Sequence, residues 1–253
     1  PKGCMQSQKF WVMVGCLAAL RYKDIKSVLA DAPFFYIDDQ YMVIMGLYSG
    51  MTVHVSKGMS ARRFLDWIED HKIELAYFPT PILETPKSSR DTSTSLKKFI
   101  GFALNAELTR LVEERFNVLT RDSFGMTEIG MGLLVPDTVN SDAALNSCGL
   151  PAAFRDVKIV DDNGNEVESG ISGELWVKGA GIIDGYYKKP KANKETFIDG
   201  WFRTGDIFVA DKLGFYTIVG RMKDMIRRSM ENISALEVET AIRSKQGIED
   251  AAA

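Results

Sequence analysis

The sequence has few of the residues that build metal clusters or disulfide frameworks. It contains three cysteines, Cys4, Cys16 and Cys148, and only two histidines, His54 and His71. No cysteines form a CxxC pair and their number is odd, so we expect free thiols in a reducing compartment, which predicts a cytoplasmic protein. The same scarcity argues against a structural zinc site.

Long apolar runs and a strong charge imbalance are also missing. The most apolar stretch near the start, residues 11–20, is shorter than the ~20 residues of a membrane span. It also lacks the basic leader and cleavage site of a signal peptide. The formal net charge is −3, so no basic excess predicts binding to nucleic acid or to an anionic membrane. With 45% hydrophobic residues, the composition is that of a globular protein with a core.

Strand and helix patterns alternate over the first half of the chain. The first of them, residues 8–30, indicates a helix followed by a connector, and the apolar run 41–48 suits either a buried helix or a buried strand. The remaining patterns predict strands at 50–55, 75–78 and 96–102 and helices at 60–72 and 106–116. Because strands alternate with helices of about 10–15 residues, we expect an α/β fold with a parallel sheet.

The pattern changes at about residue 147. Short β-rich runs follow at residues 157–160, 174–178, 207–210 and 215–219, separated by turn sequences. They predict a small antiparallel β region. A basic stretch after Gly220 then leads into an expected helix at 235–244, and it could be a hinge into another domain.

We therefore expect three parts: an α/β part over 1–146, a β-rich part over 147–221, and a hinge with the start of a further domain over 222–253. The chain starts without Met and ends on an alanine run. We expect both ends to be cuts through a longer protein.

The first candidate site is the tripeptide Pro1-Lys2-Gly3. A lysine at a loop edge could hold a phosphate as a point charge beside free backbone N–H groups. The alternative is a solvated lysine at a chain end.

The second candidate site is residues 122–128, which follow an apolar run and so lie near the end of a strand, where parallel sheets gather ligands. Phe124 offers a flat face for a base, and Gly125 permits close approach. Thr127 and Glu128 could serve a phosphate and its Mg²⁺. The alternative is a loop with a helix start that Thr127 and Glu128 cap.

Two further candidates lie in the β-rich part. In residues 201–206, Asp206 follows a glycine and could grip a ribose diol, and the alternative is a tight turn between strands. In residues 220–224, Arg221 could bind ribose or phosphate and Lys223 could lie at a pivot. The alternative there is a solvated basic loop.

The order and spacing of these clusters resemble the adenylate-forming superfamily of acyl-CoA ligases, peptide-synthetase adenylation domains and beetle luciferases. The shared motifs are the Pro-Lys-Gly that ends the phosphate loop, Phe-Gly-Met-Thr-Glu at 124–128, Gly-Glu-Leu at 173–175, Gly-Tyr-Tyr at 185–187, Thr-Gly-Asp at 204–206 and Gly-Arg-x-Lys-Asp at 220–224. The resemblance covers essentially the whole chain. It implies the superfamily's N-terminal domain, with parallel α/β sheet layers and a small antiparallel β-barrel region, and the start of a small α+β C-terminal domain.

The resemblance also implies roles for individual residues. Lys2 and Thr127 contact the ATP phosphates, Glu128 holds Mg²⁺, and these three are the catalytic candidates. Lys223 is the pivot about which the C-terminal domain rotates. The nucleotide-binding candidates are Gly101, Phe102, Ala103, Asp122, Phe124, Gly125, Asp206, Ile218 and Arg221. Among them, Asp122 reads the adenine amino group, and Asp206 and Arg221 bind the ribose hydroxyls. Tyr36 and Met131 are the candidates for the acyl pocket.

Within the superfamily, residues 33–40 and 227–234 look like the carnitine/crotonobetaine-CoA ligase group. In that comparison Asp38 or Asp39 could meet a quaternary ammonium, and Tyr36 could contribute to a cation cage. The alternative for the two acids is solvation in a loop.

Three departures from the superfamily pattern stand out. Tyr36 replaces a common histidine and can reshape the acyl pocket. Ser229-Met230 replaces a usual Gly-Gly, so Met230 is expected to crowd the pantetheine path. The superfamily's C-terminal catalytic lysine would lie beyond residue 253.

The resemblance implies an AMP-forming acid–thiol ligase that uses ATP, Mg²⁺ and coenzyme A and activates a small carboxylic acid. One alternative is an adenylation domain that loads an acyl or aminoacyl group onto a carrier protein. Others are a non-catalytic nucleotide-binding module and a purely structural domain. The oligomeric state stays open, a homodimer included.

Overall fold

The structure is a computed structural model that describes residues 2–228, 231–245, 247–248 and 250–252. The chain divides into two compact units, the first made of Pro1–Phe154 with Gly179–Lys188 and the second of Arg155–Lys178 with Lys189–Ala253. The three-part domain division expected from the sequence stays a prediction. Met230 lies outside the described residues, and with it the expectation about the pantetheine path.

The first unit contains a five-stranded parallel sheet in the order β2-β1-β3-β4-β5. Its strands are β1 (Ser27–Ala30), β2 (Thr52–Val55), β3 (Leu75–Tyr77), β4 (Lys98–Ile100) and β5 (Leu119–Arg121). All four residues of β1 are buried, as expected for a parallel strand covered on both faces. The parallel α/β sheet predicted from the sequence is therefore confirmed, although β1 lies where only a connector was expected.

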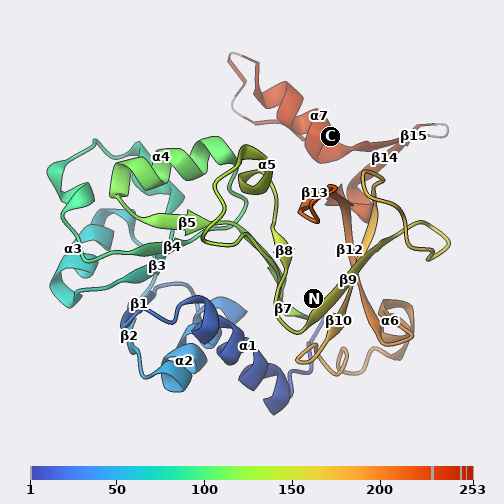
Figure 1. Ribbon diagram of the computed structural model, residues 1–253, viewed down its shortest axis with the longest axis horizontal. Helices are drawn as coiled ribbons and strands as arrows, with labels where there is room; N and C mark the ends of the chain where they lie inside the picture. Colours follow the sequence, from blue (N-terminus) through green and yellow to red (C-terminus); the bar gives the residue numbers. More distant parts are fainter. Residues whose placement is uncertain (1, 229–230, 246, 249, 253) are drawn as a thin grey trace. The chain divides into compact units, whose positions relative to one another are not determined.

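One helix precedes β1, and further helices and turns lie in the connections between the strands (Figure 1). They are α1 (Gln8–Arg21), α2 (Ile37–Ser49), α3 (Ala61–His71) and α4 (Ala106–Phe116), with short 3₁₀ turns η1 (Thr80–Glu84) and η2 (Ser89–Thr92). The apolar run 41–48 is thus helical. Helix α2 also contains Asp38 and Asp39, which corrects the alternative of a solvated loop. Asn105 caps α4 by accepting a hydrogen bond from the Leu108 N–H at 2.7 Å. The helix ends at Asn117, whose φ of 51° is left-handed.

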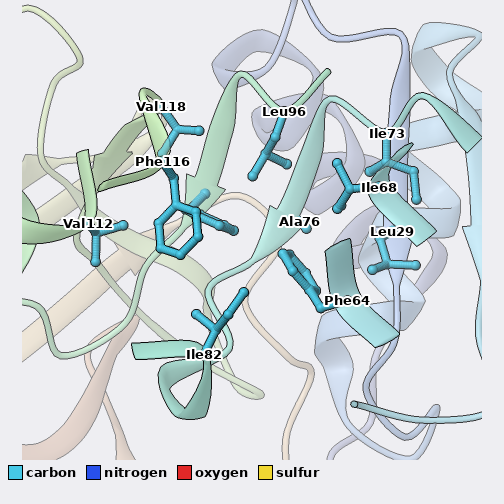
Figure 2. Close-up of a cluster of buried hydrophobic side chains, with 11 residues drawn as sticks. Leu29, Phe64, Ile68, Ile73, Ala76, Ile82, Leu96, Val112, Phe116 and Val118 are labelled. Carbon is cyan, nitrogen blue, oxygen red and sulfur yellow. The ribbon is translucent and has the colours of Figure 1, made fainter. Parts of the chain in front are cut away.

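The sheet and two of its helices enclose a continuous apolar core, shown in Figure 2. Helices α3 and α4 contribute Phe64, Ile68, Val112 and Phe116, which pack against strand and loop side chains. Those partners are Leu29, Ile73, Ala76, Ile82, Leu96, Phe99 and Val118. This packing fixes the sheet, and the sheet fixes where the loops after its strands begin.

A second, antiparallel sheet follows in the same unit, in the order β6-β7-β8. It consists of β6 (Ser123–Met126), β7 (Gly130–Leu134) and β8 (Leu150–Pro151), with the short helix α5 (Asp142–Leu145) between β7 and β8. The alternative given from the sequence for 122–128 was a loop with a helix start capped by Thr127 and Glu128. It is corrected here, because Ser123–Met126 is a strand that pairs with β7.

The second unit is mainly antiparallel. Its larger sheet has the order β11-β12-β10-β9. Strand β11 pairs with residues 201–202 of β12, and β13 pairs with residues 206–210 of β12. The elements are β9 (Arg155–Val160), β10 (Gly173–Gly179), α6 (Pro190–Thr196), β11 (Phe197–Ile198), β12 (Trp201–Ala210), β13 (Tyr216–Arg221), η3 (Met222–Asp224), β14 (Met225–Arg228), β15 (Glu231–Ser234) and α7 (Ala235–Arg243). Strands β14 and β15 form a separate antiparallel pair. The antiparallel β region predicted after residue 147 is confirmed.

Candidate active site

The hairpin of β6 and β7 carries the most distinctive candidate residues of the first unit. Its tip is the turn over residues 127–129. The pairing of β6 with β7 has a bulge between Phe124 and Gly125. A Cβ atom on Gly125 would lie 2.6 Å from the Gly130 carbonyl oxygen, so only glycine fits there. The tip of this hairpin carries Thr127, which is exposed, and Glu128, which is half-buried.

Two segments distant in sequence hold this tip. The Gln6 side-chain amide donates to the Thr127 carbonyl oxygen at 3.1 Å, and the Ile183 N–H donates to the Glu128 carbonyl oxygen at 2.9 Å. The Tyr186 hydroxyl donates to Glu128 Oε1 at 2.8 Å. Burial, together with this hydrogen bond to a carboxylate, raises the pKa of Tyr186 above its ordinary value, so the phenol stays a donor. The carboxylate of Glu128 is therefore held by a residue that lies 58 positions further along the sequence.

Lys2 lies against the same tyrosine. Its Nζ atom is 4.2 Å from the centroid of the Tyr186 ring, a cation–π contact, and the Tyr187 N–H donates to the Gly3 carbonyl oxygen at 2.8 Å. Lys2 and Glu128 thus both contact Tyr186, Lys2 through the face of the ring and Glu128 through the hydroxyl. Tyr186 belongs to a motif that the sequence singled out, but nothing in the sequence pattern assigned it this function.

Cys4 lies in the same group of residues. It forms an isolated antiparallel bridge with Tyr186. Burial and the neighbouring Glu128 raise the pKa of the Cys4 thiol to about 11, so it is a neutral thiol at physiological pH.

A second set of candidates follows the ends of β4 and β5. Phe102 is the second residue after β4. It is 48% exposed and stacks on the Tyr77 ring at 5.6 Å between centroids. Ala103 has a left-handed φ of 54°. A Cβ atom on Gly101 would lie 2.2 Å from the Leu104 side chain, which explains the glycine. These residues form a partly exposed aromatic surface at the carboxyl edge of the parallel sheet.

Asp122 is buried directly after β5, and its Oδ1 atom has no hydrogen-bond partner in the part of the chain that the structure describes. Burial raises its pKa to about 7, against the opposing effect of nearby backbone N–H groups of Ser123, Leu104 and Ala103. A buried acceptor without a partner suits a ligand that carries an N–H donor.

A cavity of about 310 Å³ opens between α1, the start of α2 and the β6–β7 hairpin. Its lining residues are Val14, Arg21, Tyr22, Ile37, Asp38, Tyr41, Ile100, Phe102, Ser123, Phe124, Gly125, Met126, Thr127, Gly130, Met131 and Leu134. Met131, expected in an acyl pocket, is among them, as are Phe124 and Gly125. Tyr36 is not: it is 53% exposed and packs on the Phe35 ring at 4.5 Å. Its neighbours Ile37 and Asp38 line the wall in that region.

In the second unit, Asp206 and Arg221 are partners across β12 and β13. Arg221 Nε lies 3.0 Å from Asp206 Oδ1, and the aspartate is 1% exposed whereas the arginine side chain is 58% exposed. Asp206 therefore lies within a strand, which corrects the alternative of a tight turn. Ile218 is partly exposed on β13. Lys223 is exposed in η3.

Glu174 organises the backbone before Asp206. Its Oε1 accepts from the Gly205 N–H at 3.0 Å, and its Oε2 accepts from Arg203 Nε at 2.9 Å. The Thr204 hydroxyl donates to the Leu175 carbonyl oxygen at 2.7 Å. Gly205 has a φ of 73°, which explains the glycine between Thr204 and Asp206. Glu174 is thus a supporting residue that sequence reasoning placed in a motif without assigning it a role.

These motifs and the folds that carry them match one protein family. The family model described as AMP-binding enzyme matches residues 1–187. The chain belongs to this family.

Two acid–CoA ligases resemble the chain over nearly its whole length. It is 30% identical over 258 aligned positions to a feruloyl-CoA synthase of an Amycolatopsis species, covering 98% of this chain and 52% of that protein. It is 31% identical over 255 positions to a 2-succinylbenzoate–CoA ligase of Bacillus licheniformis, covering 99% and 53%. The chain spans about half the length of the curated relatives that it matches.

Solved structures show the same fold. An O-succinylbenzoate coenzyme A synthetase from Bacillus subtilis, in complex with ATP and magnesium ion, superposes with a TM-score of 0.90 at 26% identity, covering 100% of this chain and 54% of that one. The predicted fold, the N-terminal domain of an adenylate-forming enzyme, is therefore confirmed. The likeness to the carnitine/crotonobetaine-CoA ligase group stays a prediction. Among the described residues, no helix combines the length and the apolar character needed to cross a membrane.

Proposed function

We propose that the protein activates a carboxylic acid with ATP to an acyl-adenylate and then transfers the acyl group to coenzyme A. The observation that carries this proposal is the convergence of Lys2 and Glu128 on Tyr186 at the hairpin tip, beside Thr127. A cation, a hydroxyl and a carboxylate at one tip are the groups that a magnesium–phosphate ligand requires. The named acid–CoA ligases among the relatives support the same activity.

In the first half-reaction, a carboxylate oxygen of the acid attacks the α-phosphorus of ATP. A new P–O bond forms, the bond to the bridging oxygen breaks, and pyrophosphate leaves with that electron pair. The protein has to offset phosphate charge and align the reactants. We assign to Lys2 the positive charge that offsets the phosphates, and to the hydroxyl of Thr127 a hydrogen bond to a phosphate.

Glu128 fits a hard cation. Its carboxylate is half-buried, and one of its oxygens already accepts from Tyr186, which fixes its orientation. Mg²⁺ is commonly bound through one or two carboxylates, substrate phosphates and water, so one protein carboxylate is enough for this assignment. The described residues contain no group of three or more His, Cys, Asp or Glu that could hold a metal. When bound, Mg²⁺ would offset charge on the phosphates.

Each unit supplies its own candidate contacts to the nucleoside. In the first, we assign the adenine to the aromatic side chains of Phe102 and Phe124, with the orphan Oδ1 of Asp122 accepting from its amino group. In the second, we assign the ribose hydroxyls to Asp206 and Arg221, whose ion pair holds the carboxylate in place.

In the second half-reaction, the thiol of coenzyme A attacks the acyl carbon and AMP leaves. We propose Lys223 as the hinge residue for the domain rotation that this step requires. We also propose a cytoplasmic location, which the three free cysteines support.

The test is carboxylate-dependent exchange of pyrophosphate into ATP by the intact protein, followed by the loss of free thiol when coenzyme A is added. We expect exchange to require an acid and Mg²⁺, and thioester to form only when ATP, the acid and coenzyme A are all present. If no acid in a broad panel supports exchange, the proposed activity is wrong. If exchange occurs without thioester, the transfer step is wrong.

A further inference from the structure

Asp38 is a charged residue on the wall of the 310 Å³ cavity. It lies in the first turn of α2 and is half-buried. The Tyr77 hydroxyl lies 3.0 Å from its Oδ1 atom and also 3.0 Å from the Tyr41 hydroxyl. A phenol has one proton, so a consistent arrangement has Tyr41 donating to Tyr77 and Tyr77 donating to Asp38.

This chain of hydrogen bonds fixes the carboxylate without neutralising it. Tyr41 and Tyr77 are 6% and 7% exposed, and burial raises the pKa of both well above the ordinary value of a phenol. Both therefore stay neutral donors. Among the described residues, Tyr77 is the one side chain that donates to Asp38, and it occupies Oδ1 only.

The cation that lines the same cavity is engaged elsewhere. The guanidinium of Arg21 donates to the Tyr22 hydroxyl at 3.3 Å and to the Val135 carbonyl oxygen at 3.3 Å. No ion pair joins it to Asp38 within the described part of the chain. The cavity thus contains a fixed carboxylate that forms no ion pair with any cation of the described residues.

Most of the remaining lining of the cavity is apolar and includes Ile37, Ile100, Met131 and Leu134. A wholly apolar acid in this cavity would remove water from Asp38 without replacing the lost hydrogen bonds, which is unfavourable. A ligand with a hydrogen-bond donor would replace them. A hydroxyl and a protonated amine both meet this requirement, and the amine would also balance the charge.

We propose that the acid substrate carries, apart from its reacting carboxylate, a hydroxyl or protonated amine that Asp38 binds in this cavity. The inference rests on the proposed adenylation activity and adds the substrate class. Position on the first turn of a helix also favours an acid for electrostatic reasons alone. The experiment therefore has to distinguish stabilisation of the helix α2 by Asp38 from binding of the substrate by Asp38.

The probes are three acids that differ at one end: hexanoate, 5-hydroxypentanoate and 5-aminopentanoate. Pyrophosphate exchange by the intact protein gives kcat/KM for each. We expect at least one donor-bearing acid to exceed hexanoate by about 100-fold, because a site built to bind a donor discriminates strongly against its absence. The hydroxyl and amine probes separate the two possible donors.

The decisive variant is Asp38→Asn, which keeps an oxygen that can accept from Tyr77 but removes the charge and the second acceptor. We expect it to reduce the preference for the donor-bearing acid over hexanoate to below about fivefold, mainly by lowering kcat/KM for the donor-bearing acid. Asp24→Asn makes the same change at an exposed position after α1 and should keep the wild-type preference. A thermal melt of each variant checks folding.

Two results overturn the inference alone. Equal kcat/KM for all three acids in the wild-type protein removes the inference while adenylation stands. A loss in Asp38→Asn that is the same for every acid shows a structural role. If no acid supports exchange at all, the proposed function is wrong, and the inference that rests on it is wrong as well.

Discussion

Two acidic residues proposed to meet ATP, Glu128 in the first unit and Asp206 in the second, are held in different ways. Glu128 is half-buried at a hairpin tip, and its side-chain partner Tyr186 comes from a distant segment. Asp206 is buried within a strand and pairs with Arg221 on the neighbouring strand. One position depends on a long-range contact, whereas the other depends on the register of an antiparallel pair. The following predictions test that difference.

The largest effect is expected from Glu128→Ala. It removes the proposed metal ligand and should reduce pyrophosphate exchange by about 10²–10³-fold, because electrostatic stabilisation of the reacting phosphates is lost. The melting temperature should change little, since the residue is at a hairpin tip. Glu168→Ala, an exposed position in the second unit, is the matched control. Exchange at the wild-type rate in Glu128→Ala would remove the metal assignment.

The two glycines before these acids should differ in what they tolerate. Gly125→Asn should destabilise the protein by about 1–3 kcal/mol and reduce exchange, because any Cβ meets the Gly130 carbonyl oxygen. At Gly205 an added Cβ atom would meet no other atom within 4 Å, and asparagine tolerates its φ of 73°. Gly205→Asn should therefore cost under about 1 kcal/mol. Denaturant titration measures both, and equal losses would contradict the steric argument.

Asp206→Asn should raise the KM for ATP by about 10–100-fold, since hydrogen bonds to charged groups contribute about 1.5–3 kcal/mol. The change is isosteric, so β12 and β13 should remain paired. Asp199→Asn is the control, because this exposed residue has a φ of 50° that asparagine also adopts. A KM for ATP that is unaltered in Asp206→Asn would show that the buried acid only pairs with Arg221.

Tyr186→Phe tests the long-range contact directly. Removing the hydroxyl leaves the ring for Lys2 but frees the Glu128 carboxylate, and we expect the Mg²⁺ concentration for half-maximal exchange to rise about tenfold. Magnesium-dependent binding of ATP, measured by calorimetry, should weaken in parallel. Tyr187→Phe at the next, exposed position should behave as wild type. If the two variants behave alike, Tyr186 does not position Glu128.

The smallest effect concerns how the buried acid Asp122 makes the stability of the protein depend on pH. Burial raises the pKa of Asp122 to about 7, so the folded protein keeps this proton where the unfolded chain, with a pKa near 4, has lost it. The stability that Asp122 contributes is therefore lost as the pH rises from about 4 to 7. Asp122→Asn resembles the protonated form and should be more stable than wild type by about 1 kcal/mol or more at pH 8.

Below about pH 3 the two proteins should unfold at the same denaturant concentration, because Asp122 is then largely protonated in both the folded and the unfolded state. Asp24→Asn, at an exposed position, should show no such pH dependence. A gain for Asp122→Asn that is equal at both pH values would show a packing effect rather than a charge effect.

Much of the fold could be predicted because its signals are local. The helix over 106–116 begins and ends as expected, since Asn105 supplies a cap and Asn117 a left-handed end. Strand β1 was missed because four residues in a short loop-like context give too little pattern. The strand over Ser123–Met126 was missed because its pairing partner, β7, provides the hydrogen bonds, and glycine in its interior argues against a strand.

The site shows the same division. The motifs identified Glu128, Asp206 and Arg221, and the family match confirms the family that the motifs indicated. The functional roles of these residues stay predictions. Tyr186, Glu174 and Asp38 stood out in the sequence, but their contacts had no sequence signal, because each residue acts through a partner that folding brings near.

By itself, the sequence determined the α/β class, the antiparallel region after residue 147 and the family, because periodicity, caps and motif spacing are written along the chain. Only the tertiary structure decided which side chains meet. It placed Lys2 and Glu128 on Tyr186, made Asp206 a strand residue, and put Asp38 on a cavity wall with its charge unpaired by the described residues. The physical reason is that burial and hydrogen bonding between distant residues arise from packing, which no local pattern records.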